Sequence, residues 1–126
     1  MLLEKFTTYC LSKSGTSEDF PGKGQAVWMK AGGKMFAMTN VEPMKMDGEE
    51  VLPFHFINLK CDPERAMALR SQYAAIMPGW HQNKTHWNTL LMGQDLPDSL
   101  IYELTDHSYD LAIAALSKVD REGLGQ

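Results

Sequence analysis

Residues 80–90, "WHQNKTHWNTL", place two tryptophans, two histidines, two asparagines and one lysine in a single short stretch. An ammonium group such as that of Lys84 can contact a phosphate, while Trp80, His81 or His86 can stack on a base or donate a hydrogen bond. The chemistry that this composition favours is recognition of a ligand, and nucleic acid is the first candidate.

Catalysis and metal binding have less support in the sequence. His81 and His86 lack the spacing of a helical metal pair, and His55 and His107 lie elsewhere in the chain. The two cysteines form no C-x-x-C pair, and no nucleophile elbow, Cys–His arrangement or phosphate-cradling loop can be recognised. We therefore expect no catalytic residue, no metal and no cofactor, and a protein that is not an enzyme.

Acidic residues are unevenly distributed along the chain, whose formal net charge is −4. Residues 65–94 contain Arg65, Arg70 and Lys84 but no Asp or Glu, so all 16 acidic residues lie outside this stretch. The gap indicates either a basic recognition face or simply a helix, a buried loop and a central strand in succession. In the first case Lys60, Arg70 and Lys84 are the candidates for contact with phosphate.

The polar residues of the segment also have a structural interpretation. Trp87 can be buried with its N–H on a carbonyl, while His81 and Asn83 hydrogen-bond to the backbone of a loop. We favour this interpretation for His81, Asn83 and Trp87, and contact with phosphate for Lys84, whose ammonium would lie on a turn.

A binding role of another class remains open. The sheet face or a helix–sheet cleft could bind a small metabolite or a protein partner, with exposed aromatic residues such as Trp28 or Phe56 as anchors.

Periodicity and turn residues predict the elements that position these groups. Residues 2–13 fit an amphipathic helix, with Gly15 beyond its end. Residues 25–40 predict two strands joined at Gly32 and Gly33, because a Gly-Gly pair supplies the positive φ of a tight hairpin. Residues 41–53 predict an exposed loop, and residues 54–61 predict a central strand.

The second half of the chain predicts further helices and one more strand. Asp62 can cap a helix that begins at Pro63 and ends before residues 78 and 79, Pro-Gly. Residues 85–92 predict a strand, followed by a turn at residues 93–95. In residues 96–118 the apolar pattern falters before Leu111, so we expect two helices, the second capped by Asp106 or Ser108.

Length and element order define the expected architecture. The 126 residues, 44% of them hydrophobic, predict a single domain covering residues 1–126. No apolar run approaches the roughly 20 residues of a membrane span, and Cys10 and Cys61 are expected to be reduced thiols, so we expect a cytoplasmic protein without a membrane partner. The fold class is α+β, a single layer pair in which a mostly antiparallel curved sheet has helices on one face.

Finally, the run "PGWHQNKTHWNTL" resembles the H-x-N-K-x-H-W motif of the MmcQ/YjbR family. The segments "GTSEDFP", "GGKMFAM", "LKCDPERAMALR" and "DHSYDLAIAAL" extend the resemblance over nearly the whole chain. It implies a CyaY-like fold, whose curved antiparallel sheet has been compared with a double-wing DNA-binding arrangement, and hence a non-catalytic domain that binds DNA. Because the net charge is −4 and about three phosphate contacts can be named, we expect such binding to be weak and independent of sequence.

Overall fold

A computed structural model describes residues 1, 3–20, 26–41, 55–80, 82–92 and 96–124. Its elements, in chain order, are α1 (Leu3–Leu11), β1 (Thr16–Asp19), β2 (Ala26–Ala31), β3 (Lys34–Asn40), β4 (Phe56–Lys60), α2 (Pro63–Gln72), β5 (Ile76–Pro78), β6 (Trp87–Leu91), α3 (Asp98–Ala114) and α4 (Lys118–Gly123). The predicted turn at residues 93–95, His81 and all but the first residue of the predicted loop at residues 41–53 lie outside the described residues.

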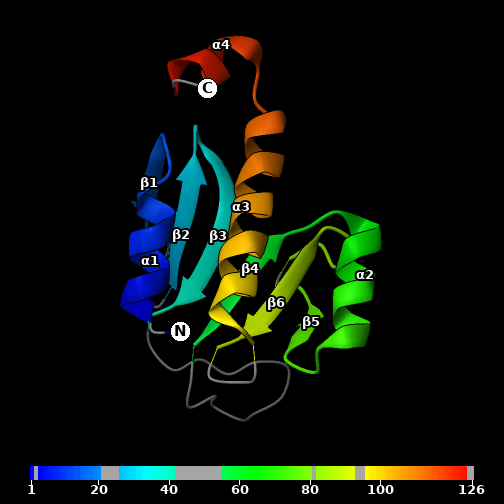
Figure 1. The fold of residues 1–126 in the computed structure, drawn as a ribbon. Coiled ribbons are helices and arrows are strands. Elements are labelled where there is room, and N and C mark those ends of the chain that lie inside the picture. The colour runs from blue at the N-terminus through cyan, green and yellow to red at the C-terminus, as the bar shows by residue number, and fades with distance from the viewer. Residues whose placement is uncertain (2, 21–25, 42–54, 81, 93–95, 125–126) are drawn as a thin grey trace.

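The strands form one open antiparallel sheet in the order β1-β2-β3-β4-β6-β5 (Figure 1). The predicted hairpin of β2 and β3 is confirmed, since Gly32 and Gly33 form its turn with φ values of 57° and 85°. The predicted strand at residues 54–61 is also confirmed, because β4 lies between β3 and β6.

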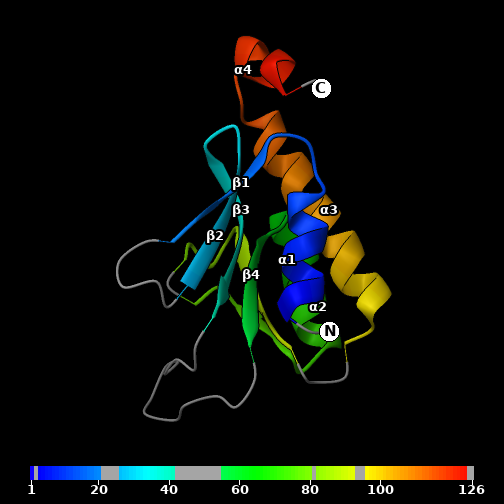
Figure 2. The ribbon, with the colours of Figure 1, turned by 90° about the vertical axis from the view of Figure 1, so that its left-hand side faces the viewer.

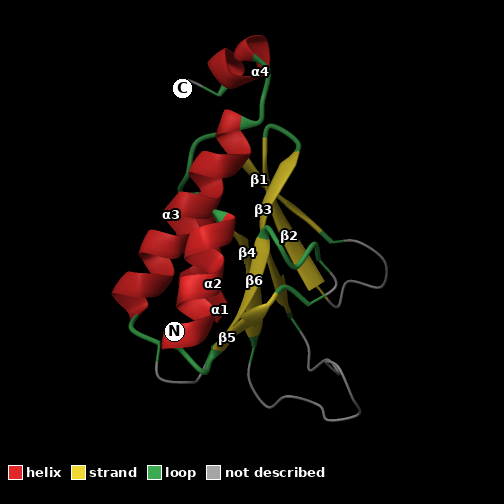
Figure 3. Cartoon of the chain, turned by 90° about the vertical axis from the view of Figure 1, so that its right-hand side faces the viewer, coloured by secondary structure: helices red, strands yellow, loops and turns green. Residues whose placement is uncertain are grey.

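Helices α1, α2 and α3 all cover the same face of the sheet, as Figures 2 and 3 show from opposite sides. The predicted α+β architecture is therefore confirmed. The main core fills the space between these two layers, where Phe6 of α1 and Ile101 of α3 are buried with Met29, Phe36 and Ile57 of the sheet. β2 and β4 turn alternate side chains toward this core, namely Val27, Met29 and Ala31 of β2 and Ile57 and Leu59 of β4, as the two-residue period of a strand requires.

A smaller apolar cluster lies on the opposite face of the sheet. It consists of Ala26, Met38, Phe56 and Trp80, with Trp28 packed against it. The first three residues come from β2, β3 and β4, whereas Trp80 comes from the segment between β5 and β6. That segment thus packs onto the face that α1, α2 and α3 leave open.

The C-terminal helical region differs from the prediction. α3 continues without a break through Asp106 and Ser108, so neither residue caps a second helix. Ser108 is fully buried, where its hydroxyl donates to Phe36 O and accepts the backbone N–H of Lys60 (2.8 Å). These bonds fix α3 to β3 and β4. The cap of α4 is Ser117, which accepts the N–H of Asp120 (3.2 Å).

Two strands were not predicted, and both lie at the edges of the sheet. β1 contains only Thr, Ser, Glu and Asp, and β5 has three residues and ends at Pro78. β1 is mostly exposed and β5 is short, so neither carries the alternation of apolar and polar residues over four to eight positions that identifies a half-buried strand. None of the described helices is long and apolar enough to cross a membrane.

Candidate functional site

The segment rich in His, Asn and Trp lies between Gly79 and Trp87, whose backbones are hydrogen-bonded to each other; we call its described residues, 79–80 and 82–87, the 79–87 loop. Its two tryptophans are buried, with 7% of Trp80 and 8% of Trp87 exposed. The four residues before Trp87, namely 83–86, are all exposed. The loop therefore has an apolar base and a polar, exposed tip.

Trp80 is held on the open face of the sheet by its ring and by its backbone. Its ring packs edge-on against that of Phe56, with centroids 5.2 Å apart and an interplanar angle of 86°. Its backbone N–H donates to Thr89 Oγ1 (2.8 Å), and its carbonyl accepts from Asn58 Nδ2 (2.9 Å). Thr89 Oγ1 in turn donates to Asn58 Oδ1 (2.5 Å), and both side chains are fully buried. A buried polar network of this kind fixes one geometry, because every broken bond leaves a desolvated group unpaired.

Gly79 closes the base of the loop through a direct backbone contact with Trp87. Its N–H donates to Trp87 O (2.9 Å). A Cβ atom at this position would lie 2.6 Å from Trp87 Cβ and 2.9 Å from Trp87 O, closer than real Cβ contacts. Glycine is therefore required here because the two backbone segments approach so closely.

Arg70 of α2 hydrogen-bonds to the C-terminal half of the loop and to the start of β6. Its guanidinium donates to Asn88 Oδ1 (2.6 Å), to Trp87 O (3.2 Å) and to Lys84 O. Asn88 Nδ2 donates to Ala66 O (3.4 Å), so the same cluster ties the start of β6 to α2. The planar fork of an arginine suits this arrangement of several fixed acceptors.

The tip of the loop is ordered by its own side chains. Asn83 Oδ1 accepts the backbone N–H groups of Thr85 (2.9 Å) and His86 (3.3 Å), which is a local Asx-type turn. Lys84 Nζ donates to Gly79 O (3.0 Å) across the loop. His86 is exposed, and its carbonyl accepts the N–H of Cys61 (2.8 Å).

Three cationic residues gather around Trp87. Lys60 is its partner across β4 and β6, Arg70 donates to its carbonyl, and Lys84 lies three residues before it. Within the described residues none of these three cations has a carboxylate partner, whereas Lys5, Lys13, Lys30 and Arg65 all do. Hydrogen bonds to neutral carbonyls leave the formal charges of Arg70 and Lys84 uncompensated, so both cations can interact with an anion.

The predicted site residues thus fall into one region, with different accessibilities. Asn83, Lys84 and His86 are exposed at the tip, Arg70 and Lys60 are half-buried beside it, and Trp80 and Trp87 are buried. His81 lies outside the described residues. The two aromatic anchors proposed for the open sheet face differ in exposure. Phe56 is fully buried, whereas Trp28 is half-buried. The expectation that Phe56 is exposed was wrong, since Trp80 packs over it.

The described histidines and cysteines do not converge. His107 Nε2 accepts the backbone N–H of Asp62 (3.2 Å), while His55 Nδ1 lies 2.6 Å from Asn40 O. Cys10 and Cys61 are free and buried, and burial raises the pKa of both thiols. Over the described ranges, no three His, Cys, Asp or Glu side chains are grouped so that they could hold a metal ion.

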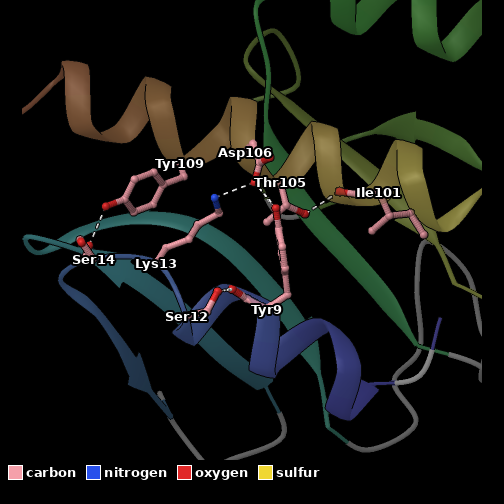
Figure 4. A network of polar contacts seen from close by, with 8 residues as sticks. All are labelled: Tyr9, Ser12, Lys13, Ser14, Ile101, Thr105, Asp106 and Tyr109. Atoms are coloured by element: carbon pink, nitrogen blue, oxygen red, sulfur yellow. Dashed lines mark hydrogen bonds and ion pairs between the residues drawn. The ribbon is translucent and has the colours of Figure 1, made fainter. Parts of the chain in front are cut away.

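A second polar cluster, between α1 and α3, was not predicted from the sequence. Figure 4 shows Tyr9 and Lys13 converging on Asp106 of α3, with bonds of 2.5 Å from Tyr9 Oη and 2.6 Å from Lys13 Nζ. The ammonium of Lys13 also lies 5.2 Å from the ring centroid of Tyr9 and 5.0 Å from that of Tyr109. Beside this cluster is an open groove of about 530 Å³, lined by Glu4, Lys5, Thr8, Tyr9, Ser12 and Tyr102.

The ionisation of this second cluster matches its hydrogen bonds. The hydrogen bond to Asp106, aided by burial, raises the pKa of Tyr9 to about 12. Burial alone would raise the pKa of Asp106, but the bonds from Lys13 and Tyr9 lower it overall. At neutral pH Tyr9 is therefore a protonated donor and Asp106 an ionised acceptor.

The fold and the 79–87 loop together define a small α+β protein with an open antiparallel sheet and a polar loop hydrogen-bonded to α2, β4 and β6. The family model described as YjbR matches residues 11–111. An uncharacterised protein YjbR of Escherichia coli K12 is 33% identical over 126 residues, covering 100% of this chain and 99% of the relative. The chain therefore belongs to the YjbR family, and the resemblance carried by the sequence motifs is confirmed.

Further similarities extend to another organism and to solved structures. The uncharacterised protein YyaQ of Bacillus subtilis is 31% identical over 104 residues, which cover 79% of this chain and 87% of the relative. The crystal structure of a Deinococcus radiodurans protein with a DUF419 domain superposes with a TM-score of 0.82 at 29% identity, covering 98% of this chain and 87% of that one. A Pseudomonas syringae crystal structure gives a TM-score of 0.74 at 27% identity, covering 89% of this chain and 99% of that one.

Proposed function

We propose that this YjbR-family chain is a non-catalytic module that binds the phosphate backbone of duplex DNA weakly through the tip of the 79–87 loop. One observation carries the proposal: Lys60, Arg70 and Lys84 gather around Trp87 without a carboxylate partner among the described residues. Arg70 and Lys84 belong to the stretch from position 65 to 94, which contains no acidic residue, whereas Asp62 and Glu64 separate Lys60 from it.

The construction of the loop supports a binding role. Buried bonds of Asn58 and Thr89 hold Trp80, and Arg70 holds the carbonyls of Lys84 and Trp87. What this scaffold leaves exposed is a polar tip that includes an ammonium and an imidazole. A tip that is ordered before binding loses less conformational entropy when a ligand arrives, which makes even a few contacts effective.

The same geometry limits affinity and specificity. Three phosphate contacts release few counterions, and the net charge of −4 repels a polyanion at long range. Trp80 and Trp87 are buried, so they do not take part in stacking in this proposal. Lys60, Arg70 and Lys84 contact phosphates, and His86 and Asn83 add hydrogen bonds, so binding is independent of base sequence.

Fluorescence anisotropy with a labelled random duplex, at low and at moderate salt, tests this function. Lys84→Glu should weaken low-salt binding strongly. Lys118→Glu is the matched control, because Lys118 is an exposed cation at the start of α4, far in sequence from the loop. Absence of low-salt binding in the wild type, or equal effects of the two substitutions, would rule the proposal out.

A second candidate function has its own observation, the groove of about 530 Å³ between α1 and Tyr102 of α3. Its size suits a small metabolite, and its tilted Tyr9 and Tyr102 rings, with centroids 4.4 Å apart, offer aromatic surface. Thr8→Trp would fill the groove from α1. A thermal-shift screen in which some metabolite stabilises the wild type but not Thr8→Trp would favour this candidate, and equal shifts would exclude it.

A further inference from the structure

Two carbonyls of the 79–87 loop accept a hydrogen bond from the backbone as well as one from a cation. Gly79 O accepts the N–H of Gln82 (3.3 Å) in addition to the ammonium of Lys84 (3.0 Å). Trp87 O accepts the N–H of Gly79 (2.9 Å) in addition to Arg70 Nη2 (3.2 Å). If Lys84 moves away, Gly79 O still accepts the N–H of Gln82, and Trp87 O likewise keeps the N–H of Gly79 if Arg70 moves.

The two cations nevertheless differ in how firmly they are held. Arg70 makes three bonds, to Asn88 Oδ1, Lys84 O and Trp87 O, and so joins α2 to the loop. Lys84 is exposed, and its ammonium makes one bond to the described part of the chain, to Gly79 O. An ammonium has three N–H donors and a flexible stem, so it can exchange a neutral acceptor for a charged one.

We propose that Lys84 is a movable ligand for a single tetrahedral phosphate oxyanion. Its ammonium leaves Gly79 O and donates to a phosphate oxygen, forming a shorter and stronger charge-assisted bond. Gln82 N–H stays on Gly79 O, and Arg70 stays on its three acceptors, so the loop keeps its closed shape while the cation turns outward. This inference rests on the proposed function and assigns one of its three phosphate contacts, that of Lys84, to a motion of the side chain.

If Lys84 binds phosphate while Arg70 holds the loop, substitutions of the two residues should have different effects. A structural role shared by both residues would give them the same effects. Removing the charge of Lys84 should weaken phosphate binding and leave the melting temperature nearly unchanged, since Gly79 O, its partner among the described residues, keeps a second donor. Removing the guanidinium of Arg70 should lower the melting temperature as well, because Asn88 Oδ1 and Lys84 O lose the donor that joins them to α2.

Amide NMR with inorganic phosphate as the probe tests the inference on the full chain. Phosphate is added against chloride at matched ionic strength, and the backbone N–H of Gln82 is followed because it shares Gly79 O with Lys84. We expect a saturable shift of the Gln82 signal in the wild type and in Lys84→Arg, which keeps the charge. Lys84→Gln should weaken the apparent affinity by at least about tenfold, as the loss of a charge-assisted hydrogen bond does, while Lys118→Gln should not change it.

The outcomes distinguish this inference from the proposed function. If the Gln82 signal does not respond to phosphate, or responds equally in Lys84→Gln, the movable-ligand inference is wrong even where duplex DNA still binds. If phosphate shifts Gln82 through Lys84 but duplex DNA does not bind at low salt, the subsite stands and the DNA-binding proposal falls. A large fall in the melting temperature of Lys84→Gln would also overturn the inference, since it would show that the loop depends on this cation.

Discussion

The substitution Thr89→Val tests whether the buried network fixes the 79–87 loop. It keeps the volume and the β-branching of the side chain but removes the hydroxyl that joins Trp80 to Asn58. In the wild type this hydroxyl accepts from Trp80 N–H (2.8 Å) and donates to Asn58 Oδ1 (2.5 Å). In the variant, Trp80 N–H and Asn58 Oδ1 each lose this partner, and each loss costs about 1–3 kcal/mol. We therefore expect the free energy of unfolding to fall by about 2–6 kcal/mol.

Urea unfolding followed by circular dichroism measures this change, and a constant m-value shows that stability rather than compactness has altered. Thr85→Val is the matched control, because it makes the same chemical change at an exposed position of the loop tip. We expect it to change stability by no more than about 0.5 kcal/mol. A loss below about 1 kcal/mol in Thr89→Val, or losses of equal size in the two variants, would refute the role we give the network.

Three further predictions concern other parts of the fold. Gly33→Val should destabilise the protein by about 1–2 kcal/mol, because the hairpin turn requires a φ of 85° there; an unchanged melting temperature would contradict this. Trp87→Ala should cost about 3–5 kcal/mol in urea unfolding, since the side chain is only 8% exposed, and a loss under about 1 kcal/mol would mean that the indole is not part of the core. Because the pKa of Tyr9 is raised from 10.0 to about 12, the stability that its protonated hydroxyl contributes should be present below pH 10 and disappear as the pH rises to 12. The urea midpoint of the wild type should therefore fall over this range more steeply than that of Tyr9→Phe, and parallel curves would count against the Tyr9–Asp106 bond.

The elements that could be predicted from the sequence are those that a few neighbouring residues identify. The Gly32–Gly33 turn and the Asp62–Pro63 helix start each depend on residues adjacent in the chain, and both are present, with Asp62 accepting the N–H of Arg65 (3.3 Å). The structural roles favoured for Asn83 and Trp87 also agree with the structure, since Asn83 caps the turn and Trp87 is buried.

The remaining features depend on contacts between distant residues. Arg70 meets its acceptors 14 to 18 positions away, and Ser108 bonds to Phe36 across 72 positions, so neither role has a periodic signature. A serine within a faltering helical pattern suggests a cap, whereas here burial against β3 and β4 keeps α3 continuous. In the sequence, the Pro-Gly pair at residues 78 and 79 indicates only where the preceding helical unit ends. The structure shows that position 79 requires a glycine because Trp87 lies so close to it.

The salt dependence of duplex binding, compared between the wild type and Lys84→Gln, tests the central claim most directly. Three neutralised phosphates predict that log K falls with log salt at a slope of about −2.7, and removal of one contact predicts about −1.8. Anisotropy titrations over a series of salt concentrations give both slopes. A wild-type slope near zero, or the same slope in both proteins, would contradict the proposal that Lys84 of the 79–87 loop contacts the phosphate backbone.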